Sequence, residues 1–210
     1  MLKKILDSDP DDTDATAMLA RCLIFLSHID RLTVDRKKLR QAESVLSQAL
    51  KKHPDNPALL RLMCSVNHYF RNENLVKKYL SKLEEINYYY EGASTIRGNL
   101  SFDRDLVTAL IHYEDELKRH PKVVAYACNK ITALYRLGRM DDLIEYADDY
   151  IKNHGNQRDL LLKAGMFCYD VGHDAYNEQL ELIRVFQNKF PPVYVDEKKK
   201  CRRQKIHVKV

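Results

Sequence analysis

The sequence predicts an all-α protein: an α-solenoid of antiparallel helix pairs, followed by a short irregular or β-like tail. The clearest pair lies in residues 121–155, where apolar residues recur at helical spacing on either side of Gly138. The residues expected to face inward are Val124, Ala127, Ile131 and Leu134 in the first helix and Leu143, Ala147, Tyr150 and Ile151 in the second. A pair this short cannot bury both of its faces, so it needs copies of itself as neighbours.

Copies of this pair are visible as an internal repeat. The pattern Lys-x-His-Pro stands at Lys51–Pro54 and again at Lys118–Pro121, and Lys152–Gly155 has Gly in place of the Pro. The separations are 67 and 34 residues, close to two units and one unit of a 34-residue period. Pro and Gly fall mainly between the expected helices, as an all-helical chain requires.

The period and its punctuation resemble the tetratricopeptide repeat family, which carries small or apolar residues at fixed positions and a Pro near the end of each unit. The matching residues are Ala42, Leu46, Ala49 and Pro54 in one repeat, Ala109, Tyr113 and Pro121 in another, and the glycines Gly138 and Gly165. The chain departs from the pattern at Glu116 and Arg97, where the family has small or apolar residues, and it contains no Trp. The resemblance implies the family's solenoid fold over nearly the whole chain.

Under this resemblance, residues 1–192 form the solenoid and residues 193–210 form a basic tail. The repeats expected are a half unit at residues 1–12 and full units at 13–56, 57–89, 90–123, 124–157 and 158–191. The third full repeat has the poorest first helix, because Gly92 and Gly98 fall inside it. We therefore expect a flexible joint there, with faster amide exchange over Ala93–Phe102 than over Val123–Leu137.

The net charge of +5 lies entirely in the last fifteen residues, while the rest of the chain is neutral. The basic tail consists of Lys198, Lys199, Lys200, Arg202, Arg203 and Lys205. It is interpreted either as a solvated end or as an edge strand, a nuclear-localisation signal or a nucleic-acid patch. Nucleic-acid binding is the weaker alternative, because the tail is short and the body offers no continuing positive track.

No pattern of catalytic or metal-binding residues stands out. The sequence has no Gly-rich phosphate loop, no Gly-x-Ser-x-Gly and no His-Glu-x-x-His. The aspartates between Asp7 and Asp14 lack the Gly and Glu of a calcium loop and are better explained as helix caps. Five separated cysteines and no recognisable signal peptide favour a cytoplasmic protein. We expect no enzyme activity, no cofactor, no metal and no membrane partner.

The remaining candidate is a binding surface. The family lines its concave groove with fixed positions of each first helix, and these carry over to Arg21, Phe25, Arg61, Ser65, His68, Tyr69, Phe102, Thr132, Tyr135, Arg136, Met166 and Tyr169. The family's carboxylate clamp for chaperone tails needs Lys and Asn where this chain has Arg61 and Ser65, so that clamp is not expected. Three adjacent tyrosines, Tyr88–Tyr90, suggest either packing at an irregular junction or an exposed stacking surface.

The main hypothesis is a non-catalytic adaptor or scaffold that holds a peptide or helix of a protein partner in this groove. Arg and Tyr are the side chains that most often anchor interfaces, and both are present in the set. The alternatives are the solenoid arm of a larger enzyme, such as a glycosyltransferase, or a nucleic-acid-associated protein that uses the basic tail. The apparent half repeat at the start and the strand-like pattern after residue 193 motivate the first alternative.

Overall fold

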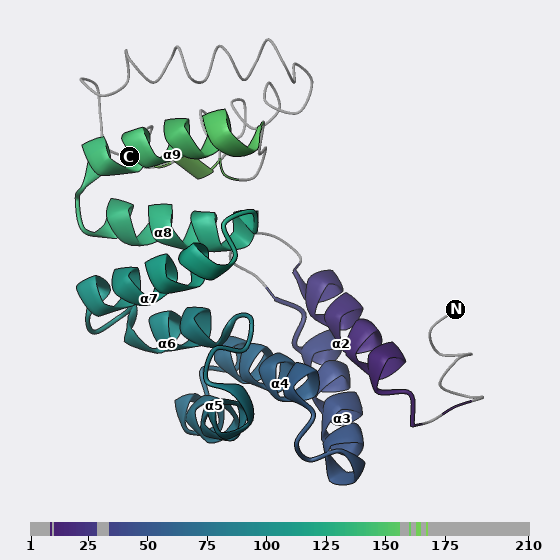
Figure 1. Cartoon of the computed structure of the whole chain (residues 1–210). Helices are drawn as coiled ribbons and strands as arrows, with labels where there is room; N and C mark the ends of the chain where they lie inside the picture. Colours follow the sequence, from purple (N-terminus) through teal and green to yellow (C-terminus); the bar gives the residue numbers. More distant parts are fainter. Residues whose placement is uncertain are drawn as a thin grey trace, which may run out of the picture. The chain divides into compact units, whose positions relative to one another are not determined.

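Figure 1 shows the computed structural model of the chain, in which Asp9 and residues 11–28, 34–155, 160, 163, 164 and 167 are described. This part of the chain is all α-helical. The helices are α2 (Thr13–Ser27), α3 (Arg36–Lys52), α4 (Pro57–Tyr69), α5 (Glu73–Asn87), α6 (Ala93–Ser101), α7 (Leu106–Arg119), α8 (Val124–Arg136) and α9 (Met140–His154). The predicted all-α class is confirmed, while the fifth full repeat and the basic tail lie almost wholly outside the described residues.

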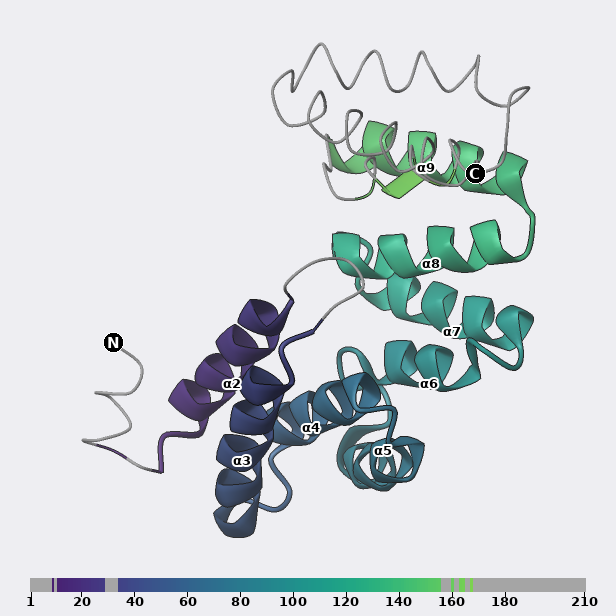
Figure 2. The same ribbon diagram turned by 180° about the vertical axis from the view of Figure 1, so that it is seen from behind.

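The chain divides into two compact bodies, Met1–His120 and Pro121–Val210. The first, here called the N-terminal body, contains the pairs α2–α3, α4–α5 and α6–α7, and Figure 2 shows the same pairs from behind. The C-terminal body contains α8 and α9. The predicted limits of the individual repeats remain predictions.

Short polar side chains begin most of the helices. Asp12 accepts from the N–H of Ala15 (2.8 Å), and Asn56 and Asp105 cap α4 and α7 in the same manner. The prediction that an aspartate of the acidic cluster caps the first helix is therefore confirmed. From the sequence, Asp141 or Asp142 is the expected cap of α9. That expectation is wrong, because the residue before the helix is Arg139, whose side chain pairs with Asp142.

Two apolar clusters lie in the core of the described part of the N-terminal body. In the first, the alanines of α2 pack against α3 and α4; in the second, Leu60 and Cys64 of α4 meet Val76, Leu80 and Leu83 of α5. The apolar spacing of the sequence predicts inward faces for α4 (Leu60, Met63 and Cys64) and α5 (Val76, Leu80 and Leu83), and all six residues are buried. On α2 the same spacing predicts Met18 and Leu26 as inward-facing, which is wrong, since both are exposed and Ala17 and Ala20 face the core instead. The small alanines let α3 approach closely, which the apolar spacing alone did not indicate.

The pair α6–α7 corrects the assignment of the small packing position. Gly98, not Arg97, lies against α7, and a Cβ atom at Gly98 would come within 2.8 Å of Cδ1 of Tyr113 and closer still to Cε1. Gly92 does not lie inside the helix as predicted. It precedes α6 with a φ of 89°, a conformation that Gly adopts without strain.

Glu116, the other departure from the repeat pattern, caps α6 from the neighbouring helix. Its fully buried carboxylate accepts from the N–H of Gly92 (2.8 Å) and of Ser94 (3.0 Å). Arg119 and His120 place nitrogens 3.6 Å from the same carboxylate. The start of α6 has no side-chain cap of its own, so Glu116 satisfies donors that would otherwise be buried without partners.

The tyrosine run combines exposure with packing against arginine. Tyr88 and Tyr89 are 51% and 61% exposed, but the guanidinium of Arg97 lies 3.8 Å from the Tyr88 ring centroid and that of Arg119 lies 5.1 Å from the Tyr89 centroid. Arg97 also pairs with Glu84 at 2.7 Å. These contacts, with the Glu116 cap, give physical reasons to expect order at α6 rather than the flexible joint expected from its glycines.

In the C-terminal body, α8 and α9 bury the faces predicted for them. Ala127, Ile131 and Leu134 of α8 are buried, as are Leu143, Ala147 and Tyr150 of α9, and Gly138 forms the turn with a φ of 71°. Val124 and Ile151 are half-buried. The helices of the described ranges contain no segment that is both long and apolar enough to cross a membrane.

Cys22 and Cys64 should differ sharply in reactivity. Both are free thiols, but Cys22 is exposed, whereas Cys64 is buried in the α4–α5 core and that burial raises its thiol pKa to about 12. We expect a maleimide at neutral pH to label Cys22 within minutes and Cys64 only after unfolding, as read by peptide mass spectrometry. Equal labelling of the two residues in the native protein would contradict the placement of α4.

Candidate partner-binding surface

Six of the predicted groove residues of the N-terminal body stand on α2 and α4, the first helices of two neighbouring pairs: Arg21, Phe25, Arg61, Ser65, His68 and Tyr69. Arg21 and Phe25 stand one turn apart on α2, and Arg61, Ser65 and His68 follow one another at helical spacing on α4. Helix α2 contacts α4, and α4 contacts α6. We call the set Arg21, Phe25, His28, Arg61, His68 and Tyr69 the first-helix surface.

A direct contact joins the two helices at the C-terminal end of this surface. The Tyr69 hydroxyl lies 3.0 Å from Nε2 of His28, and the two rings meet edge to face with centroids 5.1 Å apart. Nδ1 of His28 lies 3.0 Å from the Ile24 carbonyl and donates to it, because a carbonyl oxygen can only accept. Sequence reasoning missed His28, although it follows Arg21 and Phe25 at helical spacing on the same face.

The aromatic part of the first-helix surface combines exposed and desolvated groups. Phe25 is 78% exposed, more than any other large apolar residue in the described part of the chain. Desolvation raises the pKa of the Tyr69 hydroxyl and lowers the pKa of His68, for which the nearby Asp103 partly opposes the effect. Both groups are therefore neutral at physiological pH.

Arg21 and Arg61 form the basic part of the surface. Among the described residues, neither Arg21 nor Arg61 lies within ion-pair distance of a carboxylate, and Ser65 donates to the Arg61 carbonyl at 3.3 Å. Arg97, in contrast, pairs with Glu84, and Arg104 with Glu73.

Phe102 follows the last residue of α6, and its neighbours Leu100 and Asp103 line a polar pocket. Its half-buried ring packs on Tyr113 with centroids 6.4 Å apart. The neighbouring pocket has a volume of about 310 Å³ and lies between the α4–α5 turn and the end of α6. Its lining residues include His68, Arg71, Asn99, Asp103 and the Arg104–Glu73 ion pair.

Of the groove residues predicted in the C-terminal body, Thr132, Tyr135 and Arg136 lie on α8. Thr132 donates its hydroxyl to the Cys128 carbonyl (2.6 Å), and Tyr135 stacks on Phe167 with centroids 4.2 Å apart. Arg136 is exposed. The predicted groove residues Met166 and Tyr169 lie outside the described residues. Tyr135 therefore contributes to packing, and its truncation would not report on binding alone.

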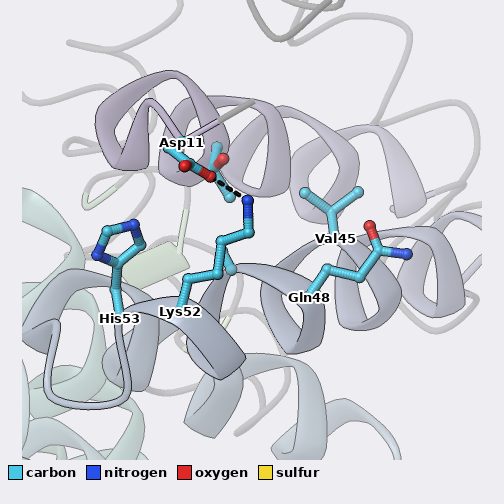
Figure 3. A pocket seen from close by; sticks show the side chains of 7 residues that line it. Asp11, Val45, Gln48, Lys52 and His53 are labelled. Carbon is cyan, nitrogen blue, oxygen red and sulfur yellow. Dashed lines mark hydrogen bonds and ion pairs between the residues drawn. The ribbon is translucent and has the colours of Figure 1, made fainter. Parts of the chain in front are cut away.

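A second pocket, of about 280 Å³, lies between the start of α2 and the end of α3 (Figure 3). Lys52 and Asp11 form an ion pair across it, and Val45, Gln48 and His53 line its α3 side. The charged side chains of this pocket, Lys52 and Asp11, therefore pair with each other. Within the described ranges, no group of three or more His, Cys, Asp or Glu is arranged to hold a metal ion.

No protein-family model matches the sequence, and no curated protein matches it. Solved structures do match. A tetratricopeptide repeat protein from Parabacteroides merdae aligns over 97% of this chain and 78% of its own, with 18% identity and a TM-score of 0.62.

Two further structures give similar values. PilF of Pseudomonas aeruginosa aligns over 95% of this chain and 86% of its own (16% identity, TM-score 0.58). YrrB, described as a tetratricopeptide protein with an unusual peptide-binding site, aligns over 94% of this chain and 97% of its own (13% identity, TM-score 0.52). This chain has the tetratricopeptide-like α-solenoid fold.

Proposed function

We propose that the protein is a non-catalytic adaptor or scaffold that holds a peptide or helix of a protein partner on its first-helix surface. The observation that carries this proposal is the exposed Phe25 beside the Tyr69–His28 contact, on two adjoining helices whose Arg21 and Arg61 form no ion pair with any described residue. Exposed aromatic side chains next to Arg are typical of interface anchors. The named peptide-binding site of YrrB belongs to a protein of the same fold and adds support by analogy.

A cytoplasmic location is part of the same proposal. Cys22 and Cys64 are free thiols, which suits a reducing compartment. The polar pockets contain ion pairs rather than a nucleophile held against a general base, which favours a role in binding over a role in catalysis.

Affinity capture from the source cells with two matched double variants tests the proposal. Replacing Phe25 and Tyr69 by Ala should remove the bound partner, because truncating two aromatic anchors typically costs more than a hundredfold in affinity, about 3 kcal/mol or more. The control replaces Val107 and Ile111 by Ala, since these α7 residues are 58% and 57% exposed. Equal recovery of the same partner by both variants would refute this surface.

A further inference from the structure

The first helices of the N-terminal body are poor in carboxylates. Helices α4 and α6 contain no Asp or Glu, and the only acidic residue of α2 is Asp14 in its first turn. The second helices carry the acidic residues, among them Glu43, Glu84 and Glu116. The first-helix surface therefore has two guanidinium groups and, apart from Asp14 and the neighbouring Asp103, little opposing charge.

Arg61 is the more informative of the two arginines. It is half-buried on α4, yet it forms no ion pair with any described residue. A partly desolvated guanidinium has lost water without gaining a carboxylate, so a partner that supplies one gains charge-assisted, bidentate hydrogen bonds. Arg97 and Arg119, which are also partly buried, both have carboxylate partners within the chain.

Apolar surface lies one helical turn from these charges. Met18, 55% exposed, precedes Arg21 by three residues, and Phe25 follows it by four, so the basic and apolar parts alternate along α2. Four residues of helix span about 6 Å, the distance between alternate side chains of an extended strand or between successive turns of a helix. One short peptide can therefore reach both parts at once.

We propose that the partner segment on the first-helix surface is acidic and apolar: Asp or Glu side chains bind Arg21 and Arg61, and a large apolar side chain packs against Phe25 and Tyr69. This inference rests on the proposed function and specifies its partner. It assigns recognition to side-chain carboxylates, so amidating the C-terminus of the bound peptide leaves binding unchanged.

The test uses fluorescein-labelled ten-residue peptides, acetylated and C-terminally amidated, in which Glu alternates with Phe or Leu. Anisotropy titration of the full chain should show binding of this peptide. A version in which Lys replaces Glu, and a version in which Ala replaces the apolar residues, should each bind at least about tenfold more weakly. Raising the salt concentration should weaken binding. If the Lys version binds as tightly as the Glu version, the assignment is overturned. The same holds if an oligo-dT strand displaces the labelled acidic peptide at a lower concentration than the unlabelled acidic peptide does.

Matched variants localise the effect. Arg21→Ala with Arg61→Ala should lower the affinity at least about tenfold, whereas Arg36→Ala with Arg40→Ala, at exposed residues of α3, should not change it. Arg21→Glu with Arg61→Glu should reverse the preference toward the Lys peptide. The assignment would also be overturned if the Arg21→Ala/Arg61→Ala double variant bound the acidic peptide as tightly as the wild type. The proposed function can survive such a result. If affinity capture loses the natural partner with the Phe25/Tyr69 variant but not with the Val107/Ile111 control, the protein is still an adaptor, but its partner is not an acidic and apolar peptide.

Discussion

Replacing Gly98 by Ala should destabilise the N-terminal body by about 2 kcal/mol, although Gly→Ala inside a helix normally stabilises by about 0.5–1 kcal/mol. The reason is the close contact of α6 with α7, where an added Cβ would overlap the Tyr113 ring. That ring cannot easily move away, because it is buried and its hydroxyl donates to Oδ1 of Asn99 at 2.8 Å. Urea unfolding of the two proteins measures the difference.

A double-mutant cycle isolates the cause. With Tyr113→Leu as the background, the ring carbons that would collide with the added methyl group are gone, so Gly98→Ala should become neutral or stabilising. The coupling free energy should be about 2 kcal/mol or more. If Gly98→Ala stabilises the wild-type protein, the helices are not packed this closely.

The helical architecture was predictable because the apolar spacing and the punctuation recur along the chain. The prediction failed where packing depends on side-chain size rather than on polarity. Arg97 and Gly98 are neighbours, and the spacing of the repeat assigned the small position to the first of them, whereas the contact with Tyr113 requires the second. On α2, Met18 and Leu26 fit the helical pattern as well as Ala17 and Ala20, yet only the alanines allow α3 to approach.

The candidate surface in the N-terminal body follows from helix geometry and stays a prediction. Helices α2 and α4, which carry Arg21, Phe25, Arg61 and Tyr69, are in contact, and His28 meets Tyr69 where they end. No sequence pattern indicated that contact, because it joins residues 41 positions apart. Paired and unpaired arginines could not be told apart from the sequence either, because pairing depends on long-range contacts such as Arg97 with Glu84.

Replacing Glu116 by Ala should have the largest effect on stability of any single change considered, about 3–5 kcal/mol. The N–H groups of Gly92 and Ser94 would lose their acceptor inside the protein, and Arg119 would lose one of the carboxylates beside it. Helix α6 should then lose its ordered start, because Gly92 provides no side-chain cap. Urea unfolding should show the loss of stability, and amide exchange should accelerate over Ala93–Ser101 before it does over α4.

Glu116→Gln keeps one acceptor oxygen but places an amide NH₂ group near backbone donors. We therefore expect its stability to lie between that of the wild type and that of Glu116→Ala. This variant keeps the test informative if the Ala protein does not fold. Glu85→Ala is the matched control, since Glu85 is exposed on α5 and its removal should change stability by less than about 0.5 kcal/mol. A Glu116→Gln protein with the stability and the α6 protection of wild type would show that the carboxylate is not the cap. The departure of Glu116 from the repeat pattern would then be a tolerated substitution, and the fast exchange expected from Gly92 and Gly98 would again be the better prediction for α6.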